Sequence, residues 1–146
     1  FRSLRLRLNQ KKFYSLLILL TFAMLVIAGV FAGLGVFFSD DVILVVFGEQ
    51  YQRAGKLLPI LMFAMLFILP NYILTQGTIA INKEIYYAKI VCFVALLNIL
   101  LNIWLIPDFG AFGAACATIF SEGVLFMGLV YVFWREWIGV EGANRG

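Results

Sequence analysis

The sequence predicts an all-α membrane protein, a bundle of four transmembrane helices with one short helix at the membrane surface. The composition is 64% hydrophobic and only 13% charged, whereas a soluble domain usually has about a quarter of its residues charged. Long apolar runs without any charged residue recur along the chain, and short polar segments separate them. Since about 20 apolar residues span the core of a bilayer, these runs are long enough to be transmembrane helices.

The residue content argues against an enzyme, a metal protein or a nucleic-acid-binding protein. The sequence has no histidine, and it shows no nucleophile paired with a base, no cluster of metal ligands and no glycine-rich phosphate loop. Cys92 and Cys116 lie inside apolar runs, where small core residues are expected rather than a disulfide or a metal site. No basic surface is interleaved with aromatic residues. We therefore expect no catalytic activity, no cofactor, no metal and no nucleic acid.

Residues 1–12 form a basic segment without acidic residues, which carries Arg2, Arg5, Arg7, Lys11 and Lys12. Positive residues gather on the cytoplasmic side of membrane helices, so we predict a cytoplasmic juxtamembrane segment. A specific contact with an anionic lipid or with a substrate phosphate is the alternative. The chain begins with Phe1 and has no signal-peptide pattern, and we expect it to be a piece of a longer protein.

The first predicted transmembrane helix covers about 13–38, and a short surface helix follows it. Ser39 is a candidate N-cap for the short helix, because the acidic residues Asp40 and Asp41 then fall in its first turn. Gly48 is a candidate end, and Tyr51 is expected to lie at the membrane interface.

The second predicted transmembrane helix covers about 57–81 within the transmembrane domain 13–134. Pro59 suits its first turn, whereas Pro70 in mid-run is expected to kink it and free a backbone carbonyl. The residues Asn71, Thr75, Thr78 and Asn82 then follow one face of the helix. These polar groups either bond to neighbouring helices or line a water-filled or substrate-facing cavity.

The third and fourth predicted transmembrane helices cover about 85–106 and 111–134. A charged turn at 82–84 precedes the third helix, and a turn at Pro107-Asp108 separates the two. Asn98 and Asn102 share one helix face, because they are four residues apart. They either bond to a neighbouring helix or face a cavity.

The fourth helix carries small residues in one sector, which permits close packing of two helix backbones in lipid. These residues are Gly110, Gly113, Ala114, Ala117, Thr118, Ser121 and Gly128. Glu122 flanks this sector near mid-depth, so its carboxylate is expected to point inward, to be paired or to be protonated. It serves either a structural hydrogen bond or a proton, cation or substrate contact.

Residues 135–146 are predicted to form a cytoplasmic tail. With four spans, both termini lie on one side, and nearly all lysines and arginines lie there too. Arg53 and Lys56 lie on the opposite side. This asymmetry puts both termini in the cytoplasm.

The order of these features resembles the C-terminal part of the polysaccharide biosynthesis flippases, the O-antigen repeat-unit transporters. They belong to the multidrug/oligosaccharidyl-lipid/polysaccharide exporter superfamily. The best-matching pieces are Phe47-Gly48 with Tyr51 and Ala54, and residues 98–118 with the N-x-x-x-N, I-P and G-x-x-G-A-A elements. The resemblance covers about 13–134.

This resemblance implies a transporter of two lobes around a central cavity in the plasma (inner) membrane, working by alternating access. Such a protein moves a polyprenyl-linked oligosaccharide, an O-antigen or exopolysaccharide repeat unit, to the outer leaflet. The remaining N-terminal lobe would then be the partner of this segment. On that hypothesis, the residues expected to face the substrate or ion path are Asn71, Thr75, Asn98, Asn102 and Glu122.

The chain departs from this pattern in two ways. The first lobe is absent, and the basic cavity residues expected for a pyrophosphate-linked substrate are missing, apart from Lys89 at the end of a span. The alternatives are a related cation-coupled drug exporter, a lipid II flippase, or a four-helix membrane subunit that transports nothing itself.

Overall fold

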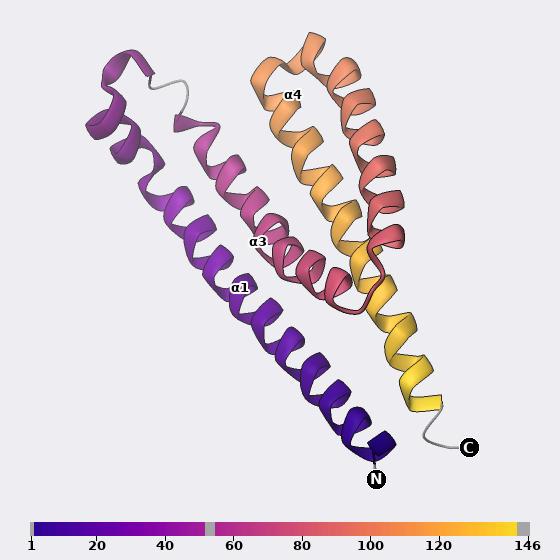
Figure 1. Cartoon of the computed structure of the whole chain (residues 1–146). Coiled ribbons are helices and arrows are strands. Elements are labelled where there is room, and N and C mark those ends of the chain that lie inside the picture. The colour runs from indigo at the N-terminus through magenta and orange to yellow at the C-terminus, as the bar shows by residue number, and fades with distance from the viewer. Residues whose placement is uncertain (1, 52–54, 143–146) are drawn as a thin grey trace.

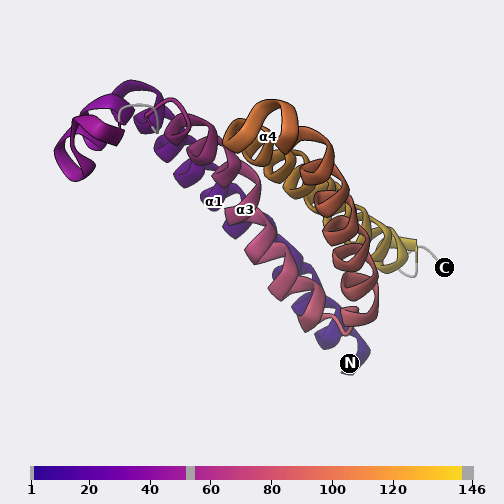
Figure 2. The ribbon, with the colours of Figure 1, turned by 90° about the horizontal axis from the view of Figure 1, so that it is seen from above.

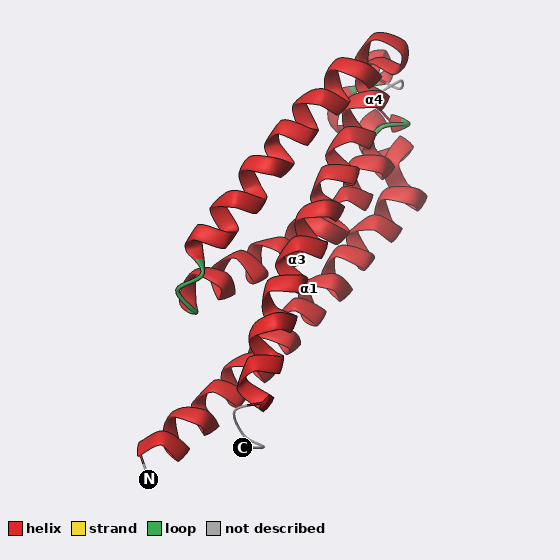
Figure 3. Cartoon of the chain, turned by 90° about the vertical axis from the view of Figure 1, so that its right-hand side faces the viewer, coloured by secondary structure: helices red, strands yellow, loops and turns green. Residues whose placement is uncertain are grey.

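The computed structural model of the chain describes residues 2–51 and 55–142, and every regular element in these ranges is a helix. The elements in order are α1 (Arg2–Phe47), η1 (Glu49–Tyr51), α3 (Leu58–Ala80) and α4 (Glu84–Gly142). Figure 3 shows that loops are confined to short connections between the helices. Three stretches are long and apolar enough to cross a membrane: Gln10–Val46, Leu58–Ala80 and Glu84–Gly139. The prediction of an all-helical protein is therefore confirmed.

The helix α1 is longer than predicted, because it includes the segment expected to form a separate surface helix. Ser39, Asp40 and Asp41 are all helical, so the predicted N-cap at Ser39 is wrong. An N-cap residue has a non-helical backbone, and neither glycine nor proline interrupts residues 36–47. Extending an existing helix adds one hydrogen bond per residue, so α1 continues. Its last turns bend away from the axis of the rest (Figure 2).

Glycine ends α1 where the sequence predicted. Gly48 has φ of +85°, and its N–H donates to the carbonyls of Ile43 and Leu44, both at 3.1 Å. Glycine adopts this left-handed conformation without steric cost, which makes it a common helix terminator. Arg53, Ala54 and residues 143–146 of the predicted tail lie outside the described residues.

In the turn after α3, backbone N–H groups donate hydrogen bonds to carbonyls at the end of the helix. The N–H of Lys83 donates to the carbonyl of Thr78 at 3.0 Å, and that of Asn82 donates to Ile79 at 2.9 Å. This is the pattern of a Schellman motif, with Asn82 at φ of +57° in the left-handed position. Lys83 Nζ lies 2.9 Å from Glu136 Oε1, and this hydrogen bond raises the pKa of Lys83. The charged turn predicted at 82–84 is therefore confirmed.

The helix α4 folds back on itself at Gly110 (Figure 1). Gly110 has φ of +56° and ψ of −133°, and it separates a first arm, 84–109, from a second arm, 111–142. The turn predicted at Pro107-Asp108 is wrong, because both of those residues are helical. Only glycine readily adopts the backbone angles found at Gly110, so the chain reverses there. The second arm also continues as helix through residues 135–142, the first part of the predicted cytoplasmic tail 135–146.

A small core cluster joins all three long helices near the end that holds both termini (Figure 1). Its buried members are Tyr14, Leu17, Leu74, Leu129 and Phe133. Gly77 of α3 lies between Leu17 and Phe133, so a side chain there would collide with both. The absence of a side chain at Gly77 therefore lets α3 lie close to α1 and to the second arm of α4.

Most large apolar side chains lie on the outside of the bundle. Phe37 is 80% exposed and Trp104 is 72% exposed, and many leucines, isoleucines and phenylalanines resemble them. A soluble protein rarely exposes such a continuous apolar surface. In a bilayer the same surface meets hydrocarbon, so the distribution agrees with the three membrane-length helices.

Candidate functional site

Two of the predicted polar residues meet across the interface between α3 and the second arm of α4. The side-chain amide of Asn71 donates to the backbone carbonyl of Glu122 at 3.0 Å and to Glu122 Oε2 at 2.8 Å. Asn71 is 4% exposed, and it follows Pro70, whose side chain is fully buried. One amide thus holds both the backbone and the carboxylate of Glu122.

A second set of contacts joins the two arms of α4 at the same level. The Asn98 amide donates to Ser121 Oγ at 3.1 Å. One turn further along, the Asn102 amide donates to the backbone oxygen and to Oδ1 of Asn98, at 2.9 and 3.0 Å. Because Ser121 and Glu122 are neighbours in sequence, the two sets form one polar network of Asn71, Asn98, Asn102, Ser121 and Glu122.

The polar network has the chemistry of a cross-link between helices, with one buried acceptor left unused in the described part of the chain. Its amide donors are directed at other members of the network, as buried polar groups in apolar surroundings require. The unused buried acceptor is Asn71 Oδ1, which has no hydrogen-bond partner in the described part of the chain. Among residues 2–51 and 55–142, no group of three or more histidine, cysteine or acidic residues could hold a metal ion.

The remaining members of the predicted stripe on α3 have separate surroundings. Thr75 lies one turn after Asn71 and is half-buried. Thr78 is fully buried, but its hydroxyl donates to the carbonyl of Leu74 in its own helix at 2.8 Å. Asn82 forms the turn after α3. The structure therefore divides the stripe among a helix interface, a helix interior and a turn.

The small residues of the second arm lie against the first arm of the same helix. A Cβ atom at Gly113 would overlap the backbone carbonyl of Leu105, and one at Gly128 would lie 2.9 Å from Ile90 Cγ2. Ala117 is fully buried, Ser121 is 4% exposed, and Ala114 is half-buried. Gly110, predicted to share this face, instead forms the turn and has open space around it. The small residues thus let the two arms approach closely enough for Asn98 to reach Ser121.

Sequence reasoning missed an apolar cavity between α1 and the second arm of α4. The cavity has a volume of about 320 Å³, and its walls include Tyr14, Ile18 and Phe22 of α1 and Trp134 and Trp137 of α4. No sequence signal could have located it. Apolar residues are expected throughout these helices, and only the arrangement of α1 and α4 around α3, whose Leu74 also lines the cavity, separates a cavity wall from the rest of the surface.

The fold and the network define a helical multi-pass membrane protein whose helices are cross-linked by buried polar side chains. Sequence comparison confirms the resemblance to proteins of glycan and polysaccharide biosynthesis. A probable low-salt glycan biosynthesis flippase of Haloferax volcanii is 33% identical over 105 residues, which is 72% of this chain and 22% of that protein. A capsular polysaccharide biosynthesis protein of Staphylococcus aureus is 28% identical over 116 residues, 76% of this chain and 29% of that protein.

A further relative is an uncharacterized membrane protein of Methanocaldococcus jannaschii. It is 31% identical over 103 residues, 70% of this chain and 20% of that protein. The chain thus spans between a fifth and a third of the length of these relatives. No protein-family model matches the chain, and no solved structure matches it.

Proposed function

We propose that the chain is part of a flippase that moves a polyprenyl-linked oligosaccharide across the plasma membrane by alternating access. The observation that carries the proposal is the 33% identity, over 72% of this chain, to a protein named as a glycan biosynthesis flippase. The match to a protein named for capsular polysaccharide biosynthesis supports the same class of substrate. An O-antigen or exopolysaccharide repeat unit would be such a substrate, and the rest of the cavity would belong to an N-terminal lobe of the same protein.

In this proposal α4 crosses the membrane twice, which makes four spans with α1 and α3. Each arm of α4 is longer than the roughly 20 residues that a bilayer core requires. Both termini lie at the same end of the molecule in Figure 1, as an even number of spans requires. The basic residues of 1–12 favour the cytoplasm for that end.

The polar network supplies the groups in this segment that a sugar headgroup or a coupling ion could meet. Moving a polar headgroup through hydrocarbon without hydrogen bonds is very unfavourable, so a flippase must provide a polar path. We propose that Asn71, Thr75, Asn98, Asn102 and Glu122 contribute to that path. In the present structure the network amides bond to one another, so substrate contact requires the α3–α4 interface to open.

The test is transport by the full-length protein in proteoliposomes that contain a lipid-linked oligosaccharide. A membrane-impermeant lectin or glycosidase reports the sugars that reach the outer face. We expect the protein to raise this rate well above that of protein-free vesicles, and an equal rate would refute the flippase proposal. Thr118→Val is a matched control for network variants, because the Thr118 hydroxyl bonds to the Ala114 carbonyl of its own helix.

A cation-coupled exporter of the same superfamily is the second candidate, and the placement of Glu122 favours it. Its carboxylate lies in an apolar segment and accepts from a buried amide. The exchange Glu122→Gln keeps an oxygen acceptor for Asn71 but removes the negative charge. If ion coupling uses Glu122, this variant loses transport driven by an ion gradient while it keeps exchange without a gradient.

A further inference from the structure

The apolar cavity between α1 and the second arm of α4, which Leu74 of α3 also lines, extends along both helices, and we call it the groove. On α1 its wall follows the residues Tyr14, Ile18 and Leu25, and on α4 it follows Val130, Trp134 and Trp137. The one hydroxyl on its α1 wall besides Tyr14 belongs to Thr21, and it donates to the Leu17 carbonyl of its own helix at 2.8 Å. The groove therefore offers almost entirely hydrocarbon and aromatic surface.

The length and volume of the groove fit one lipid chain from one leaflet. Tyr14 and Leu25 are separated by roughly 16 Å along the helix axis, which is about half of the ~30 Å hydrocarbon core. The cavity volume of about 320 Å³ equals that of roughly ten water molecules. A methylene group has a similar volume to water, so the groove has room for much of an acyl chain.

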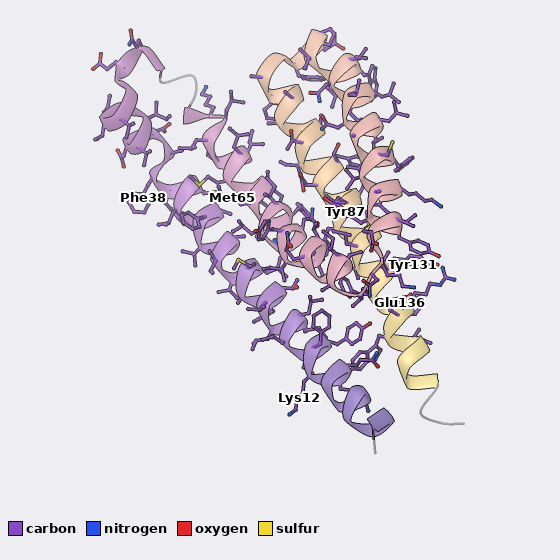
Figure 4. The ribbon with its side chains drawn as sticks, viewed as in Figure 1. Lys12, Phe38, Met65, Tyr87, Tyr131 and Glu136 are labelled. Carbon is purple, nitrogen blue, oxygen red and sulfur yellow. The ribbon has the colours of Figure 1, made fainter. Side chains whose placement is uncertain are left out.

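Positive charge lies at the end of the groove nearest the N-terminus. Lys11 is exposed and precedes Tyr14 by three residues, which places it on the groove face of α1. The neighbouring residue Lys12 lies on the side of α1 away from α4 (Figure 4). Glu136, the acid beside Trp137, is already paired with Lys83 at 2.9 Å. The mouth of the groove therefore complements a negative headgroup.

We propose that this groove binds an anionic membrane phospholipid, with one acyl chain between α1 and α4 and the phosphate beside Lys11. Basic residues next to a cavity between transmembrane helices are suited to such headgroups. The aromatic rings of Trp134 and Trp137 border the chain, as expected for residues near a membrane interface. The proposal is independent of glycan transport, because it concerns a resident lipid and not the cargo.

Tryptophan fluorescence tests this proposal, because Trp137 lines the groove and Trp104 lies on the outer surface of the described bundle, 72% exposed. The full-length protein is prepared with Trp137 or Trp104 as its only tryptophan, all others being replaced by phenylalanine. Each protein is reconstituted in phosphatidylcholine vesicles with a minor fraction of phosphatidylglycerol. Bromine, which quenches tryptophan on contact, is placed on the acyl chains of one lipid or the other.

We expect brominated phosphatidylglycerol to quench Trp137 more than an equal amount of brominated phosphatidylcholine, whereas Trp104 shows no preference. Lys11→Gln lowers the preference at Trp137 roughly fivefold, and Lys12→Gln leaves it unchanged. Equal quenching of Trp137 by both lipids overturns the proposal. So does a Trp137 that neither lipid quenches, since the groove is then covered by protein. An equal loss in the Lys11 and Lys12 variants overturns the assignment of the headgroup.

Discussion

At the scale of single residues, Asn71 is the side chain that connects α3 to the second arm of α4. Its amide donates to both the backbone and the carboxylate of Glu122. Removing it leaves the half-buried carboxylate of Glu122 without its donor in an apolar segment, which is unfavourable. The Glu122 carboxylate would then have to accept a hydrogen bond from water or from another donor.

The exchange Asn71→Leu is expected to destabilise the bundle by about 1–3 kcal/mol. Leucine has the same branching and the same number of side-chain heavy atoms as asparagine, but it is larger, so the loss combines the missing hydrogen bonds with some overpacking at this buried position. The free energy of unfolding of the full-length protein in bicelles, titrated with a denaturing detergent, measures the difference.

Thr78→Val is the matched control for this exchange. Thr78 is also buried in α3, but its hydroxyl bonds only to the Leu74 carbonyl of the same helix. We expect a loss below about 1 kcal/mol, because the interface with α4 keeps its contacts. A loss in the control as large as that of Asn71→Leu would mean that the cross-helix bond is not the stabilising contact.

The sequence predicts which residues are candidates for the polar network, but it does not predict which of them form hydrogen bonds with one another. Asn98 and Asn102 stand out because they interrupt an apolar run, and so does Glu122. Whether two such residues meet depends on how each helix is rotated about its axis. The tight packing at Gly113 and Gly128 fixes that rotation in the folded chain.

At the scale of helices, the apolar runs predict which segments are helical. The backbone conformation that single residues can adopt determines where each helix ends. Gly48 ends α1 as expected because it adopts a positive φ. Pro107-Asp108 was the wrong choice for the next reversal. A proline restricts the residue before it, but it does not force the chain to reverse. The reversal needs a residue that accepts φ of +56° with ψ of −133°, and Gly110 provides it.

The exchange Gly113→Ala is expected to destabilise the hairpin of α4 by about 1–3 kcal/mol, as overpacking usually does. The added methyl would overlap the backbone carbonyl of Leu105, which cannot move aside as a flexible side chain could. The same unfolding titration measures the effect. The Asn98–Ser121 contact should weaken as well, since the two arms must separate.

Gly29→Ala serves as the control, because a side chain there meets nothing within 4 Å inside the described bundle. Alanine is a better helix former than glycine, so this exchange should be neutral or stabilising by up to about 1 kcal/mol. Equal effects of the two exchanges would contradict close packing of the arms at Gly113.

At the scale of the whole molecule, the apolar surface is larger than the core. The core cluster at one end is small, while apolar side chains cover the outside of all three long helices. In a membrane, burial of apolar groups does not draw helices together, so packing of small residues and hydrogen bonds must do so. The close approaches at Gly77, Gly113 and Gly128 and the polar network are devices of this kind in the described bundle.

An arrangement of four spans predicts that Gln10 and Gly139 lie on one side of the membrane and that Asp108 lies on the other. Single cysteines replace these residues in full-length protein without its native cysteines, Cys92 and Cys116 included. A membrane-impermeant maleimide added to sealed cells or vesicles then labels one set or the other. If α4 crossed the membrane only once as a continuous helix, Asp108 would lie in hydrocarbon and would label from neither side. Labelling of the cysteine at position 108 from the face opposite to position 10 therefore supports four spans rather than three. The orientation of the cells or vesicles then identifies the cytoplasmic side.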